Sequence, residues 1–210
     1  YYRPGNTGIQ GDFNYALWIA PDGDPYISGF DAFFGEGGFA RFIQSENRWV
    51  NYSNVDYPAI GHPDEDGCMV VWDIAPDATG KLWMGTGRGA LRFDPAVGPD
   101  SLTRFNSGNS LLVDERTFDV ERAPDGTMWF ANNSCVRYSP STDTWTQWAF
   151  GNVRLAAQPK AGGGYFIWSA DRYFGYVFRF DSATGAWTYW LPQARGEVAG
   201  IPGMDCVGDA

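Results

Sequence analysis

Three short landmarks recur four times, in the same order, along this chain of 210 residues. The first is a Pro-Asp-Gly turn followed by an aromatic residue, as in 124–126 with Trp129; its fourth copy, 158–168, is degenerate. The second is an arginine followed by an aromatic residue, and the third is a bulky residue three positions before an aromatic one. The second landmark occurs at Arg41, Arg92, Arg137 and Arg179, and the third begins at Trp49, Leu102, Trp145 and Trp187. Such a repeat predicts one structural unit stacked several times.

Each copy contains four short apolar or alternating segments separated by turns, as in 118–123, 128–131, 136–138 and 144–148. Four short antiparallel strands in a unit of forty-odd residues is typical of a β-propeller blade. Aromatic residues at fixed offsets fill the space between adjacent sheets of such a fold. The sequence therefore predicts an all-β protein, a single β-propeller segment with four complete four-stranded blades. The expected blades are 9–52, 69–105, 117–148 and 153–190.

The two ends of the chain carry pieces of the same repeat. Residues 1–2 resemble the end of a fourth strand, and 203–210 match 71–78, where an innermost strand begins. We therefore expect partial blades at both ends and a chain that forms part of a larger ring. The remaining blades would belong to the same protein or to another chain.

Composition and charge restrict the class of partner. The chain has 15 Phe, 11 Tyr, 10 Trp, 27 Gly and 13 Pro, which argues against disorder and against a helical bundle. The formal net charge is −10, so the protein repels nucleic-acid phosphates and anionic lipid surfaces. No apolar run is long enough to insert into a membrane. We expect neither a nucleic-acid partner nor direct membrane insertion.

The second copy carries a family resemblance. Residues 71–77, 81–86 and 89–94 resemble the two-component-regulator propeller repeat, and they are also similar to the repeat of streptogramin lyase-like propellers. The first resemblance implies an extracytoplasmic sensor or binding domain, which would be secreted, periplasmic or on the cell surface. The second implies a lyase with an essential histidine and a divalent metal. Both specify the fold better than the function.

Two kinds of loop share one end of a propeller, and by analogy that end carries the ligand. They join the second strand to the third, and the fourth to the first strand of the next blade. Here the first kind comprises 28–40, 86–89, 132–134 and 170–176, two of which are rich in aromatic residues. Aromatic rings with carboxylates and arginines nearby suit a glycan, a peptide or a protein partner. The predicted ligand-binding residues are Phe30, Asp31, Phe33, Phe34, Arg88, Asn132, Arg172, Tyr173, Phe174 and Tyr176. The alternative for Phe30, Phe33 and Phe34 is that they cover a gap between blades.

Histidine and aspartate offer a second, chemical interpretation. His62 lies beside carboxylates in 61–67 and is the candidate catalytic base of a propeller lyase or hydrolase. The sequence has no second His to complete a metal site, so the alternative is a solvated histidine in a loop. Asp64 with Asp66, and likewise 22–24, are each half of a calcium loop, but the Asp-Gly pairs in them are better explained as turn formers. Asp73, Asp119 and Asp205 occupy similar positions at the start of an inner strand. We favour a hydrogen bond from each of them to a neighbouring blade, and the alternative is that they hold a cation. No cofactor is required by these patterns, but Ca or Mg is a candidate.

Three functions therefore remain open: a non-enzymatic binding module, which we favour, a metal-dependent propeller lyase or hydrolase, and a structural subunit of a cell-surface assembly. Cys68, Cys135 and Cys206 lack the C-x-x-C spacing of a zinc site, and the sequence leaves their disulfide state open.

Overall fold

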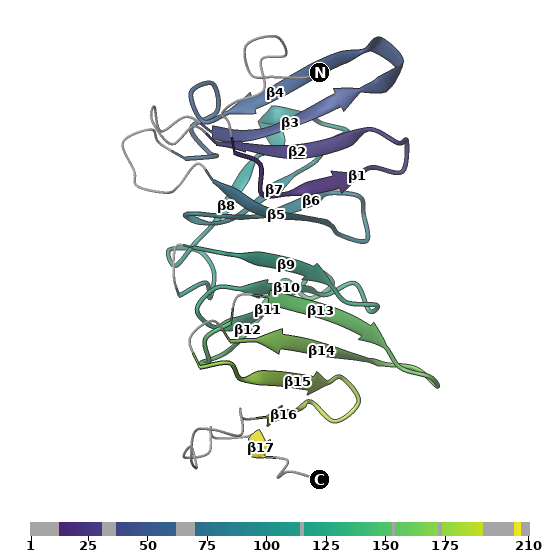
Figure 1. Cartoon of the computed structure of the whole chain (residues 1–210), viewed down its shortest axis with the longest axis vertical. Helices are drawn as coiled ribbons and strands as arrows, with labels where there is room; N and C mark the ends of the chain where they lie inside the picture. The colour runs from purple at the N-terminus through teal and green to yellow at the C-terminus, as the bar shows by residue number, and fades with distance from the viewer. Residues whose placement is uncertain are drawn as a thin grey trace.

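The computed structural model describes residues 13–30, 37–61, 70–113, 116–152, 154–171 and 174–190, and the backbone of 204–206. Its strands form four sheets that follow one another along the chain (Figure 1). Each sheet is one copy of the sequence repeat. Blade one contains β1 (Leu17–Ile19), β2 (Pro25–Phe30), β3 (Gly37–Ile43) and β4 (Arg48–Ser53). Blade two contains β5 (Val71–Pro76), β6 (Leu82–Thr86), β7 (Gly89–Phe93) and β8 (Thr103–Phe105). Blade three contains β9 (Asp119–Arg122), β10 (Met128–Ala131), β11 (Cys135–Ser139) and β12 (Thr144–Trp148). Blade four contains β13 (Arg154–Pro159), β14 (Tyr165–Ala170), β15 (Val177–Asp181) and β16 (Ala186–Trp190).

Within each blade the four strands pair in chain order, and every neighbouring pair is antiparallel. The first strands of successive blades lie against one another, β5 against β9 and β9 against β13. They therefore form the inner edge of the stack. The prediction of an all-β chain with four complete four-stranded blades is confirmed. Two short 3₁₀ helices, Gln44–Glu46 and Pro99–Ser101, lie in the turns between the third and fourth strands of blades one and two.

The C-terminal strand differs from the expectation. Met204–Cys206 (β17) was expected to begin the inner edge of a further blade. Instead it pairs in parallel with β16, the outermost strand of blade four, with Asp205 opposite Thr188. An outermost strand has an unpaired edge that accepts another strand irrespective of sequence similarity. Residues 1–2, 203 and 207–210 lie outside the described part of the chain.

The Pro-Asp-Gly turns connect the first and second strands because the aspartate captures backbone N–H groups. In blade two, Asp77 Oδ1 accepts the N–H groups of Thr79 and Lys81 at 2.8 and 3.1 Å. Its second oxygen accepts the indole N–H of Trp83 at 3.3 Å. Gly80 completes the turn at a φ of 87°, which glycine adopts without strain. The turn thereby fixes the orientation of the aromatic residue that follows it.

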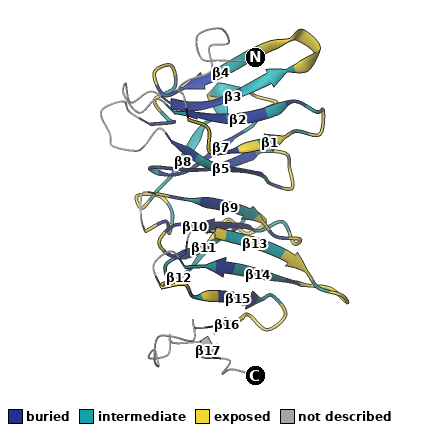
Figure 2. Cartoon of the chain, in the orientation of Figure 1, coloured by how far each residue is buried: buried dark blue, intermediate teal, exposed yellow. Residues whose placement is uncertain are grey.

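Aromatic residues fill the spaces between blades. Trp83 and Trp129 are fully buried, and every residue of β6 and β10 is buried, because these strands have a blade on each side (Figure 2). In the outer blades β2 and β14 have a mixed pattern in which buried residues alternate with half-buried ones. Each repeated arginine lies over the aromatic residue paired with it on the second strand, for example Arg137 over Trp129 at 5.8 Å from the ring centroid.

None of the helices in the described part of the chain has the length and apolar character needed to cross a membrane.

Candidate functional site

The clearest candidate site is the loop that joins β14 to β15 in blade four. Its described residues are 171 and 174–176, and we call it the aromatic loop. It lies at the same end of the blades as the β6–β7 and β10–β11 connections, because these loops all follow the second strand of an antiparallel sheet. Rigid sheets that hold an exposed loop are a common arrangement for ligand binding.

Aromatic rings lead from the core of blade four to the surface of this loop. Buried Phe150 stacks on buried Phe178, with ring centroids 4.2 Å apart. Tyr176 meets Phe178 edge to face, and Phe174 stacks on Tyr176 at 5.8 Å. Phe174 is 52% exposed. The buried rings therefore hold Phe174 in place, so binding a ligand requires little further ordering of this side chain.

Asp171 shapes the aromatic loop. Its backbone N–H donates to the carbonyl of Tyr176 at 2.9 Å, and its carboxylate accepts the backbone N–H of Phe174. The other carboxylate oxygen lies 3.1 Å from where a Cβ would stand on Gly151. Glycine at 151 thus leaves room for the carboxylate beside Phe174. The loop combines one stacking surface and one hydrogen-bond acceptor, which is the chemistry expected for a polyhydroxylated ligand.

Asn132 has a different environment from the one predicted for a ligand-binding residue. It is fully buried, and its side-chain amide donates to the Arg116 carbonyl at 2.6 Å and to Thr117 Oγ1 at 3.1 Å. We therefore assign it a structural role, connecting blade three to the segment that precedes β9. Arg88 is half-buried, and its backbone N–H donates to Thr86 Oγ1 at 3.1 Å.

The other predicted binding residues are only partly within the described chain. Phe30 ends β2 and forms an antiparallel bridge with Phe13, a residue that is 48% exposed. Asp31, Phe33, Phe34, Arg172 and Tyr173 lie outside the described residues, as do His62, Asp64 and Asp66. Their assignment to a binding face, a catalytic base or a calcium loop stays a prediction.

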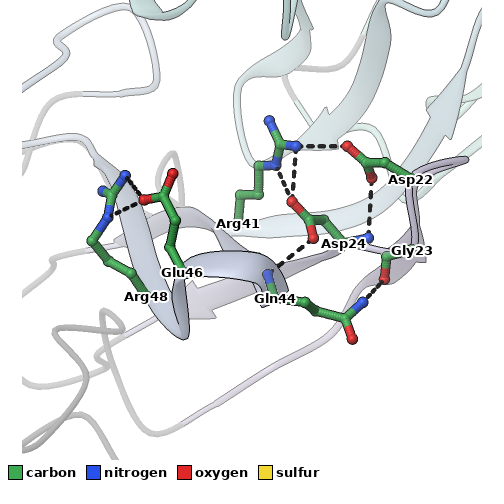
Figure 3. Close-up of polar contacts among 7 residues, drawn as sticks. All are labelled: Asp22, Gly23, Asp24, Arg41, Gln44, Glu46 and Arg48. Atoms are coloured by element: carbon green, nitrogen blue, oxygen red, sulfur yellow. Dashed lines mark hydrogen bonds and ion pairs between the residues drawn. The ribbon is translucent and has the colours of Figure 1, made fainter.

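The turn at 22–24 holds an arginine. Asp22 Oδ1 accepts the Asp24 N–H at 3.0 Å, as in an Asx turn (Figure 3). Arg41 donates to Asp22 at 2.7 Å and to Asp24 at 2.9 Å, and Asp24 also accepts the Gln44 N–H. Both carboxylates of this turn therefore pair with one guanidinium from β3, which supports the interpretation of this Asp-Gly pair as a turn former.

The inner-strand aspartates connect one blade to the next. Asp73 on β5 accepts the backbone N–H of Val120 on β9 at 2.9 Å, and Asp119 on β9 accepts that of Leu155 on β13 at 2.8 Å. An innermost strand has no sheet partner on one side, so these carboxylates satisfy N–H groups that would otherwise lack a partner. Hydrogen bonding to a neighbouring blade was the favoured expectation for these two positions.

A third carboxylate also accepts a backbone N–H of the next blade, and the sequence analysis did not single it out. Glu121 Oε1 accepts the Ala157 N–H at 3.1 Å, two positions further along β9 and β13. Its spacing of two from Asp119, which places both side chains on one face of a strand, was the available signal. Burial raises the pKa of Glu121. Burial, together with a hydrogen bond and the charge of Asp73, raises the pKa of Asp119 to about 8.

Within the residues that the structure describes, no group of three or more His, Cys, Asp or Glu side chains is arranged to hold a metal ion. Asp205 does not share the inner-strand position expected for it, because β17 pairs with β16, the outermost strand of blade four. Calcium or magnesium binding by Asp73 and Asp119 stays a prediction. Cys135 is a free, buried thiol, and burial raises its pKa. It is therefore unsuited to act as a nucleophile.

Comparison with solved structures shows the β-propeller fold. The chain superimposes on the extracellular domain of BT3049 from B. thetaiotaomicron, assigned as a hybrid two component system, with a TM-score of 0.60 and 16% identity. It matches PorZ, a surface component of the type-IX secretion system of Porphyromonas gingivalis, with a TM-score of 0.60 and 16% identity. It also matches an auxiliary nutrient binding protein from B. thetaiotaomicron, with a TM-score of 0.56 and 14% identity.

These matches cover most of this chain but only part of the other proteins. They include 80%, 86% and 87% of this chain, against 22%, 27% and 42% of the BT3049 domain, PorZ and the nutrient binding protein. No protein-family model matches the sequence, and no curated protein does. The likeness therefore establishes the propeller fold, and function has to be argued from the site.

Proposed function

We propose that this chain is an extracytoplasmic β-propeller binding module that recognises a carbohydrate through the aromatic loop of blade four. The observation that carries the proposal is that Phe174 is 52% exposed while its ring stacks on Tyr176, which packs on the core. A sugar ring has an apolar face that stacks on such a surface, and its hydroxyl groups donate to a carboxylate such as that of Asp171.

Charge supports an uncharged ligand over an anionic one. A protein with a formal net charge of −10 repels phosphorylated and carboxylated ligands. The neighbouring structures support the same class of role, because they include an auxiliary nutrient binding protein and the extracellular domain of BT3049. Their locations also support an extracytoplasmic site of action, as does the surface component PorZ.

The test is a glycan-array screen followed by calorimetric titration of the best oligosaccharide. We expect Phe174→Ala to weaken binding about tenfold, because stacking and the lost apolar contact together contribute roughly 1.4 kcal/mol. Val97→Ala is the matched control, since Val97 is 64% exposed but lies in the connection between β7 and β8, at the other end of the blades. This variant should bind as the unchanged protein does.

Equal affinity of the Phe174→Ala variant and the unchanged protein would place the ligand elsewhere. If no glycan binds, the carbohydrate proposal is wrong, and a peptide library on the same two variants would test the other ligand class. Measuring bound divalent metal in the purified protein tests the enzymatic alternative, which requires a stoichiometric ion.

A further inference from the structure

A cavity of about 430 Å³ lies where blades two, three and four meet, at the end of the blades that carries the Pro-Asp-Gly turns. This end is opposite to the aromatic loop, because the turn before a second strand and the loop after it lie at the two ends of that strand. The cavity is lined by the end of β9 with its following turn (121–126), by Ala78 in the corresponding turn of blade two, and by Ala157 and Pro159 on β13. Three blades therefore contribute to one wall, which we call the turn-side cavity.

Two charged residues of the turn-side cavity, Glu121 and Arg122, depart from the repeat. Strand register places Trp-Ile at these positions in blade one (18–19), Ala-Pro in blade two (75–76) and Ala-Ala in blade four (156–157). None of these residues carries a charge. The stacking of blades therefore does not require an acid followed by a base here, and a charged side chain in a half-enclosed position is unfavourable without a partner.

The two carboxylates of the turn-side cavity are held by neutral donors. Glu121 Oε1 accepts the Ala157 N–H at 3.1 Å. Asp125 Oδ1 accepts the N–H and the hydroxyl of Thr127 at 3.0 and 2.7 Å, and its Oδ2 accepts the Tyr165 hydroxyl at 2.9 Å. Among the described residues, no arginine or lysine lies within ion-pair distance of either carboxylate. Since each carboxylate oxygen accepts more than one hydrogen bond, both groups have capacity for a donor that a ligand brings.

The acidic and basic groups lie on different sides of the cavity. Glu121 and Asp125 are on the side of blade four, which they contact through the hydrogen bonds to Ala157 and Tyr165. The next residue along β9, Arg122, is on the side of blade two, because successive side chains of a strand lie on opposite faces. It donates to a carbonyl of that blade, that of Asp77, at 3.4 Å. Its guanidinium has further N–H donors, and no carboxylate of the described chain pairs with it.

We propose that the turn-side cavity binds a lysine or arginine side chain of a protein partner. The cation of that side chain pairs with Glu121 and Asp125, and Arg122 donates to a main-chain carbonyl of the partner. Small apolar residues contact the methylene groups of the ligand, as basic side chains require along their length. These residues are Ala78, Ala123, Pro124, Ala157 and Pro159.

Blade one shows the same recognition inside the chain. There the carboxylates of Asp22 and Asp24, in and beside a Pro-Asp-Gly turn, hold the guanidinium of Arg41 at 2.7 and 2.8 Å (Figure 3). Asp125 stands in the matching turn of blade three, where no side chain of the described chain supplies the cation. The formal net charge of −10 also favours the approach of a basic segment over an acidic one.

The experiment is a titration followed by the amide NMR signals of the isotope-labelled chain. The probe is a pentapeptide blocked at both ends, with one lysine between glycines. We expect it to shift the signals of Gly126 and Ala157, which line the cavity, and to leave that of Tyr176 in the aromatic loop unchanged. The same peptide with neutral acetyl-lysine should shift none of them. Diaminobutane, which has the ammonium group without the carbonyl, should bind less tightly than the lysine peptide.

Two variants and a matched control locate the contact. Glu121→Gln removes the charge and keeps an oxygen for the Ala157 N–H, and we expect it to weaken binding of the lysine peptide about tenfold. Ala78→Leu fills the cavity without a change of charge, at an exposed position that tolerates the larger side chain, and should also weaken binding. Glu46→Gln makes the same change of charge on the exposed 3₁₀ helix of blade one and should bind as the unchanged protein does.

Four outcomes would overturn the proposal. Unchanged signals of Gly126 and Ala157 show that the cavity does not take a basic side chain. Equal binding of the lysine and acetyl-lysine peptides shows that the charge is not recognised. Equal weakening by Glu121→Gln and Glu46→Gln shows a general attraction of cations in place of a site. Tighter binding of diaminobutane than of the peptide points to a free amine as the ligand and excludes the part assigned to Arg122.

Discussion

Replacing Asp119 by asparagine tests how the buried carboxyl groups of Asp73 and Asp119, on the inner strands β5 and β9, affect stability. Asp119 is 9% exposed and has a pKa of about 8, against an ordinary value of 3.8. It therefore keeps its proton in the folded protein near neutral pH, and it loses that proton on unfolding. The folded state binds more protons than the unfolded state between these two values, so stability decreases as the pH rises through this window.

The size of the effect follows from the difference in pKa. Each pH unit inside the window removes up to about 1.4 kcal/mol from the free energy of unfolding, so raising the pH from about 5.5 to 8.5 removes about 3 kcal/mol. Asparagine resembles the protonated acid in shape. Its amide oxygen accepts the Leu155 N–H, and its NH₂ group donates to Asp73. The Asp119→Asn variant should therefore keep its stability where the unchanged protein loses it.

The assay is urea unfolding followed by tryptophan fluorescence at several pH values from 5.5 to 8.5. Glu121, whose pKa is raised by burial, contributes in the same direction in both proteins, so the difference between the two profiles isolates Asp119. Asp181→Asn is the control, because a hydrogen bond from Lys160 lowers the pKa of Asp181 and moves its contribution to acidic pH. Parallel profiles for the Asp119→Asn variant and the unchanged protein would refute the reasoning.

Two further pairs of substitutions test the packing. Trp129→Ala should destabilise the protein by about 3–5 kcal/mol in urea unfolding, since Trp129 is fully buried. Trp168→Ala should cost clearly less, because Trp168 is only half-buried, and equal losses would contradict the burial argument. Gly89→Ala should lower the melting temperature far more than Gly80→Ala. Both glycines have positive φ, but a Cβ at 89 would lie 2.0 Å from the Phe105 carbonyl oxygen, and one at 80 meets nothing within 4 Å; similar melting temperatures for the two variants would show that backbone strain alone matters.

Much of the fold was predictable because the residues that form one propeller blade are close together in the sequence. Each blade is a run of four consecutive strands, so its turns and aromatic positions recur at nearly constant spacing in the sequence. The repeated Arg–aromatic landmark was visible as a pattern. Its physical role, a guanidinium placed over two aromatic rings of the same blade, required the neighbouring strands in three dimensions, because Arg137 and Trp148 are on different strands.

The candidate site was predictable only in part. The aromatic surplus at Phe174 and Tyr176 marked the loop that the structure exposes, since loops that bind ligands carry residues the repeat does not need. Asn132 was chosen from its loop position, and only its burial showed that its amide is used within the protein. Glu121 was missed because its partner, the backbone N–H of Ala157 in the next blade, lies 36 positions away in the sequence.

The sequence by itself determined the unit of this protein, its number of complete repeats and the type of residue at each packing position, because these depend on short-range spacing and side-chain chemistry. Tertiary structure decided which of those positions are covered. Trp129 and Trp168 occupy the same place in their blades, yet Trp129 is fully buried and Trp168 only half-buried, because burial depends on whether another blade packs against that face. It also decided where β17 pairs, since an open strand edge accepts a partner through its backbone rather than through its sequence.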